Sequence, residues 1–151
     1  MTYNHTQPGH WQFVLFAAAL VVLGCAIPPT QPPLTIILLV SAAILVLCGM
    51  AFGSLTISDE GNHLALRFGP LPLLHKTIRY ADITAVELGR TSILDGWGIH
   101  YILGRGWTYN LWGFACVKLT LGRKVIRVGT DDADELAKVI REKMGRNGLS
   151  E

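Results

Sequence analysis

The chain has 151 residues, of which 50% are hydrophobic and 16% charged, and its formal net charge is +2. This small charge, with no dense basic stripe, argues against a nucleic-acid-binding protein. The three cysteines stand far apart, at positions 25, 48 and 116, so neither a disulfide framework nor a cysteine-bound metal is expected.

Two uncharged apolar runs follow a short leader, residues 1–10. Residues 11–27 and 34–52 would form helices roughly 25 and 28 Å long, which suits the hydrocarbon core of a bilayer. The leader contains no Lys or Arg, so it lacks the basic start of a cleaved signal peptide. The connection, residues 28–33, is short and rich in proline and would make the helices antiparallel neighbours. Residues 1–53 are therefore predicted to be a leader and a two-helix transmembrane hairpin.

The distribution of charge predicts the orientation of this hairpin. All 13 Lys and Arg residues and all 11 Asp and Glu residues follow Gly53. Because basic residues are retained on the cytoplasmic side of a membrane, residues 54–151 are expected to form a cytoplasmic domain. Two spans would return the N-terminus to the same side.

Small residues along both runs allow the helices to approach closely. Gly49 and Gly53 also form a GxxxG pattern, which can pair helices of different chains. One alternative function is therefore a structural subunit of a membrane complex, with a homo-oligomer as a possible assembly.

The remaining sequence predicts strands followed by one helix. Apolar and polar residues alternate at 54–59, 63–68, 75–80, 83–89, 114–121 and 124–128. Gly122 and Arg123 make a two-residue turn between the last two of these strands. Residues 131–144 carry apolar side chains at helical spacing, with acidic residues in the first turn. We therefore expect about seven antiparallel strands within residues 54–129, closed into a small barrel and capped by a helix over 131–144.

Residues 96–113 are rich in glycine and aromatic side chains. Glycines among large rings are typical of strands that bend sharply, which is a structural interpretation. The functional interpretation is a binding surface of exposed aromatic and polar side chains. Its candidate residues are Trp97, His100, Arg105, Trp107, Tyr109 and Trp112.

The tightest basic group lies on the last predicted hairpin and consists of Arg123, Lys124 and Arg127. Such a group is either a solvated turn or a contact with anionic lipid.

Several of these segments resemble small bacterial membrane proteins with a pleckstrin-homology-like (PH-like) domain. The resemblance rests on residues 80–83 leading into 86–87, on 96–99 and 106–110, on 115–121 and on 128–132. It implies a strongly bent seven-stranded barrel with a C-terminal helix, in the inner membrane of a bacterial cell. Members that bind inositol phosphates carry a basic loop between the first two strands. Here this loop contains Asp59 and Glu60, which would repel a phosphate.

No catalytic or metal-binding constellation is evident. Asp95 and His100 form the nearest approach to an acid–base pair. Asp131 and Asp132 are better explained by capping of the helix than by a metal. No cofactor is expected. We therefore expect a non-enzymatic, membrane-anchored module that binds a peptide, a partner membrane protein or the lipid surface. An alternative is a small-ligand sensor or enzyme with its pocket at residues 96–113.

Overall fold

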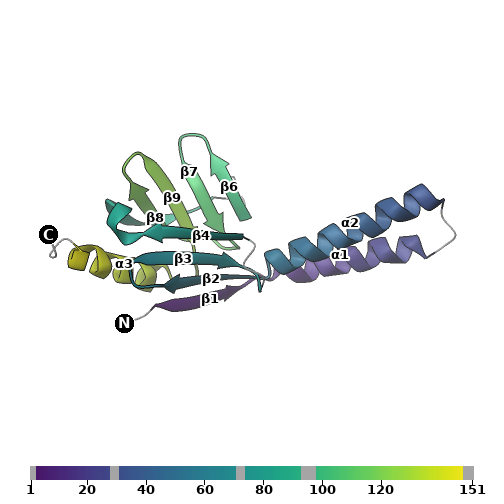
Figure 1. The fold of residues 1–151 in the computed structure, drawn as a ribbon, viewed down its shortest axis with the longest axis horizontal. Coiled ribbons are helices and arrows are strands. Elements are labelled where there is room, and N and C mark those ends of the chain that lie inside the picture. Colours follow the sequence, from purple (N-terminus) through teal and green to yellow (C-terminus); the bar gives the residue numbers. More distant parts are fainter. Residues whose placement is uncertain (1–2, 28–30, 71–73, 93–97, 148–151) are drawn as a thin grey trace.

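The computed structural model describes residues 3–27, 31–70, 74–92 and 98–147, and shows two long helices, two β-sheets and a C-terminal helix (Figure 1). The elements in chain order are β1 (Asn4–Pro8), α1 (Trp11–Ala26), α2 (Pro32–Ala51), β2 (Ser54–Asp59), β3 (His63–Phe68), β4 (Leu74–Arg79), the 3-10 helix η1 (Tyr80–Asp82), β5 (Ala85–Arg90), β6 (Gly98–Ile102), β7 (Gly106–Asn110), β8 (Ala115–Leu121), β9 (Lys124–Gly129) and α3 (Ala133–Asn147).

Helices α1 and α2 form an antiparallel hairpin that projects away from the sheets (Figure 1). Small residues lie where the two helices meet, since Ala19, Ala42 and Gly49 are buried. The large apolar side chains face outward instead, and those of Phe13 and Leu20 are 66% and 69% exposed. An apolar surface of this extent is unusual for a helix surrounded by water.

The lengths of the two helices differ. Among the described helices, α2 has the 20 residues and the apolar composition that suffice to cross a membrane, with a mean hydropathy of 2.7. Helix α1 is equally free of charge but has only 16 residues, which corresponds to about 24 Å. The two predicted helices are therefore present, and α1 ends one residue earlier than expected.

Strand β1 is an element that the sequence analysis did not assign. It lies within the predicted leader and pairs with β2 in antiparallel register, from Asn4 opposite Ser58 to Pro8 opposite Ser54. The hairpin is thus an insertion between two neighbouring strands of one sheet. At its base the Gly9 N–H donates to the Gly53 carbonyl over 2.8 Å. A side chain at Gly9 would lie 2.2 Å from the Phe52 carbonyl oxygen, so this close approach requires glycine.

The strands of the described residues form two sheets rather than the closed antiparallel barrel expected from the sequence. Their orders are β1-β2-β3-β4 and β5-β8-β9-β7-β6. In chain order, η1 follows β4 and connects the first sheet to β5 of the second sheet. Strands β7 and β9 pair in parallel, which is a further departure from the expected pattern. Strands β2 to β5, β8 and β9 lie within a few residues of the predicted strands, and α3 begins two residues later than predicted. Strands β6 and β7 lie in segment 96–113, where bent strands were expected without stated bounds, so the described part of residues 54–129 holds eight strands instead of about seven.

One hydrophobic core joins both sheets and α3. It includes Leu66 and Phe68 from the first sheet, Val117 from the second, and Leu136 and Ile140 from α3, all nearly inaccessible to solvent. Burial of each such side chain contributes about 1.5 to 3 kcal/mol. The amphipathic helix predicted from the sequence therefore covers the core, as its apolar stripe requires.

A buried ion pair fastens α3 to the turn after β2. The Lys143 ammonium lies 2.6 Å from the Asp59 carboxylate, whose side chain is fully buried. The Tyr80 hydroxyl and the Gly61 N–H also donate to this carboxylate, over 3.0 and 2.9 Å. Burial alone would raise the pKa of Asp59, but these partners outweigh it and lower the pKa. The turn carboxylate that was expected to repel a ligand is thus neutralised within the protein, and Glu60 is likewise paired with His63 and Arg67.

Candidate functional site

An open groove separates strand β4 from the turn between β8 and β9. Its volume is about 570 Å³, and a second cavity of about 400 Å³ adjoins it and shares part of its lining. We call the two together the basic cleft. Its lining consists of residues 76–79, Asp82, Tyr101, residues 104–107 and residues 121–126.

The turn between β8 and β9 is held by local sequence. Leu121 pairs with Lys124, so the loop has two residues, as predicted. Gly122 adopts a φ of +58°, a left-handed conformation that other residues rarely adopt. This turn presents Arg123 and Lys124 at one border of the basic cleft.

Lys76 provides a cation from the opposite border. On β4 the half-buried or buried side chains alternate with exposed ones, and Lys76 shares the inner face with Ile78. Among the described residues, no carboxylate lies within ion-pair distance of Lys76, Arg123 or Lys124, whereas Arg79 is paired with Asp82 over 2.9 Å. The basic cleft therefore carries three cations without a counter-ion in the described part of the chain, which makes its potential positive.

Aromatic rings form one wall of the cleft. Tyr101 lies directly opposite Trp107 on the neighbouring strand, with 5.6 Å between ring centroids. Trp107 in turn stacks on Tyr109, which belongs to the core and is only 8% exposed. Tyr101 and Trp107 remain 57% and 44% exposed. Rings of this kind offer rigid contact area at low entropic cost.

The structure brings together only some of the candidate residues in segment 96–113. Arg105 and Trp107 line the basic cleft, and Tyr109 packs behind them. His100 is half-buried on β6 opposite Thr108 and does not line the cleft. Trp97 lies outside the described residues, as does Asp95, the proposed acid–base partner of His100.

Trp112 lies at the opposite end of β7, where the sheets meet the helical hairpin. Its indole N–H donates to the Pro8 carbonyl over 2.6 Å, and its ring meets His10 edge-on at 5.1 Å. A small apolar cavity of about 170 Å³ lies at the same junction and is lined by Gly9, Trp11, Leu15, Phe52, Gly98 and Leu111.

The basic group of the last hairpin lies away from this junction. Because β9 runs parallel to β7, the turn that begins β9 is at the end of the sheet remote from Trp112 (Figure 1). Arg123 and Lys124 are therefore separated from the base of the helical hairpin by about the length of a strand, some 15 to 20 Å. Arg127 donates to the Arg105 carbonyl and so links β9 to the turn between β6 and β7.

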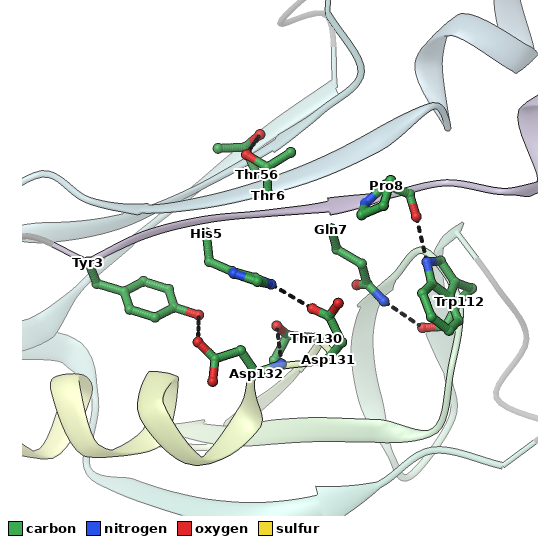
Figure 2. Close-up of polar contacts among 10 residues, drawn as sticks. All are labelled: Tyr3, His5, Thr6, Gln7, Pro8, Thr56, Trp112, Thr130, Asp131 and Asp132. Carbon is green, nitrogen blue, oxygen red and sulfur yellow. Dashed lines mark hydrogen bonds and ion pairs between the residues drawn. The ribbon is translucent and has the colours of Figure 1, made fainter.

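Three side chains at the N-terminus point to the same side of β1, whereas Thr6 points to the other side, where its hydroxyl lies 2.9 Å from that of Thr56 (Figure 2). Tyr3 donates to Asp132 over 3.4 Å, His5 lies 2.6 Å from Asp131, and Gln7 donates to the Trp112 carbonyl over 3.2 Å. Burial, with the neighbouring Asp132 charge, raises the pKa of Tyr3. Asp131 and Asp132, which the sequence predicts to cap the last helix, thus also hold the N-terminal strand.

Lys76 and Tyr101 are two residues of the cleft that were not among the candidates from the sequence. The alternation within β4 could have identified Lys76, because a charged side chain at a core-facing position of a strand is uncommon. Tyr101 could be recognised only after β6 and β7 had been paired. Within the described residues, no three His, Cys, Asp or Glu side chains gather closely enough to hold a metal.

No model of a known protein family matches this chain, and no curated protein sequence matches it either.

Proposed function

We propose that this protein is a membrane-anchored binding module whose sheet domain recognises an anionic protein partner in the basic cleft. The single observation that supports this function best is the set of three cations, Lys76, Arg123 and Lys124, beside two exposed aromatic rings. Cations provide long-range attraction, and aromatic rings provide contact area, so the combination suits an acidic peptide or protein segment.

The proposed anchor is the α1–α2 hairpin. Its outward-facing apolar side chains support insertion, since each Leu, Ile, Val or Phe contributes about −0.3 to −0.6 kcal/mol in a membrane helix. Because β1 precedes the hairpin and β2 follows it, their pairing supports a topology in which both ends of the hairpin lie on the same side of the membrane. With its basic residues after Gly53, the sheet domain would lie at the cytoplasmic face.

The membrane part of this proposal is tested with the full chain in bacterial cells. We expect the protein to resist alkaline extraction from membranes and the sheet domain to be digested by protease only in inverted vesicles. Extraction into the soluble fraction, or digestion in intact spheroplasts, would refute the anchor or its orientation.

The binding part is tested by photo-crosslinking in the same cells. A photoreactive residue in place of Arg123 reports on the basic cleft, and one in place of Glu142, on the exposed face of α3, is the matched control. We expect a discrete protein adduct from position 123, absent from position 142 and lost when Lys76 and Lys124 are changed to Glu. Identical adducts from both positions, or adducts that persist after charge reversal, would contradict binding in the cleft.

A further inference from the structure

Within the residues that the structure describes, strand β4 lies at the edge of the first sheet. It pairs with β3 on one side and is the last strand of its sheet. Four consecutive residues of this strand, 76–79, line the basic cleft, so the backbone edge borders the cleft as well as one row of side chains. An edge of this kind offers N–H and C=O groups to another extended chain.

The register identifies which groups point into the cleft. The Tyr80 N–H donates to the Asn62 carbonyl, so the backbone groups of Tyr80 face β3. Because these groups alternate along an antiparallel strand, those of Ile78 and Lys76 also face β3, while those of Thr77 and Arg79 point away from it. Thr77 and Arg79 thus present donors and acceptors along the free edge.

Another edge of the sheet domain is covered. Strand β5 is the end of the second sheet, but α3 packs against it and Arg141 donates to the Val86 carbonyl over 3.3 Å. Within the described residues, no helix or loop donates to or accepts from the outward backbone groups of Thr77 and Arg79.

We infer that the partner binds as an added β-strand along β4, with acidic side chains at alternate positions directed into the cleft. This inference rests on the proposed function and specifies the class of its ligand, an extended acidic segment of a protein. Side chains of an added strand alternate between its two faces, and those on the face of Lys76 would meet Lys76 and the turn carrying Arg123 and Lys124. The positive charge disfavours basic strands and selects acidic ones.

The experiment uses the full chain in lipid nanodiscs and a short synthetic peptide in which Glu alternates with Thr. A second peptide of the same sequence carries N-methyl groups on the amides of one edge, which removes donors but leaves every charge. We expect saturable binding of the first peptide, an increase of Kd of about tenfold or more for the methylated peptide, and slower amide exchange at Thr77 and Arg79.

Protein variants provide an independent measurement. Thr77→Pro removes the outward N–H without touching the ladder to β3, and Thr77→Ala is its matched control because it keeps this donor. We expect about tenfold weaker binding for Thr77→Pro and less than a twofold change for Thr77→Ala. If Thr77→Pro does not fold, the methylated peptide still decides the question.

The outcomes separate the two proposals. If both peptides bind equally, and Lys76→Glu with Lys124→Glu weakens both, the anionic recognition stands and strand addition is wrong. If neither peptide binds, both proposals are overturned. Binding of vesicles of anionic lipid at the cleft, without binding of peptide, would replace the protein partner by a membrane surface.

Discussion

The ion pair between Asp59 and Lys143 allows a quantitative test of how the C-terminal helix is held. Asp59→Asn keeps the shape of the side chain and an oxygen that accepts from Tyr80 and Gly61, but removes the charge that faces Lys143 over 2.6 Å. A hydrogen bond to a charged group contributes about 1.5 to 3 kcal/mol. Because the Lys143 side chain is still 22% exposed, we expect a loss near the middle of this range, about 2 kcal/mol.

Lys143→Met removes the other partner and leaves a buried carboxylate with two hydrogen bonds. We expect it to destabilise the protein by about 3 kcal/mol, the lower end of the cost of breaking a buried pair. The double variant should be little less stable than the worse single variant, so the coupling energy should be about 1 to 2 kcal/mol. Urea unfolding in detergent micelles, followed by tryptophan fluorescence, measures all three free energies. Additive effects, or single effects below about 0.5 kcal/mol, would show that this pair does not hold α3.

The same residue predicts a pH dependence. The pKa of Asp59 is lower in the folded protein than its value of about 3.9 in an unfolded chain. Its contribution to stability is therefore fully present above pH 4 and is lost as the pH falls through the folded pKa. As the pH falls below 4, the free energy of unfolding should therefore decrease less for Asp59→Asn than for the unsubstituted protein. An equal decrease in both would show that Asp59 does not cause this pH dependence.

Two further predictions concern the hairpin and the buried tyrosines. A side chain at Gly49 would lie 2.6 Å from the ring of Phe16, so Gly49→Leu should separate the helices and lower the thermal unfolding temperature in detergent. Gly24→Leu is the control and should not lower it, because a side chain at Gly24 would have no neighbour within 4 Å. Equal effects of the two substitutions would exclude this helix contact. Burial, together with a neighbouring carboxylate, raises the pKa of Tyr3 and Tyr80, and burial alone raises the pKa of Tyr109. The stability that these tyrosines contribute is therefore present below pH 10 and is lost as the pH rises. Spectrophotometric titration should show these three ionising late, and ionisation of all the tyrosines near pH 10 would refute this.

The elements that could be predicted from the sequence are those with a local pattern. The two apolar runs, the hairpin around Gly122 and the stripe of α3 each depend on residues close together in the chain, and each is present. Strand β1 could not be recognised in this way, because its inward side chains, His5 and Gln7, are polar, as is the hydroxyl of Tyr3 just before it. Each of these side chains bonds to a partner more than a hundred residues away.

The arrangement of the sheets and the cleft depended on the same kind of distant pairing. Nothing local to β7 indicates that it runs beside β9, yet this parallel pair places Arg105 and Trp107 next to the turn of Arg123 and Lys124. The residues of the glycine and aromatic segment divide between the cleft, the core and the helical junction. The surface expected from the sequence as one patch is therefore spread over both ends of β7.

Insertion of the hairpin between β1 and β2 has a consequence for biogenesis. The ribosome releases β1 first, but its pairing partner emerges only after both helices have been synthesised. In the proposed membrane arrangement, β1 must remain unpaired until the chain has passed into the bilayer and returned. If the chain failed to return, the membrane would separate β1 from the rest of its sheet. The sheet domain can therefore be completed only after the hairpin has inserted correctly.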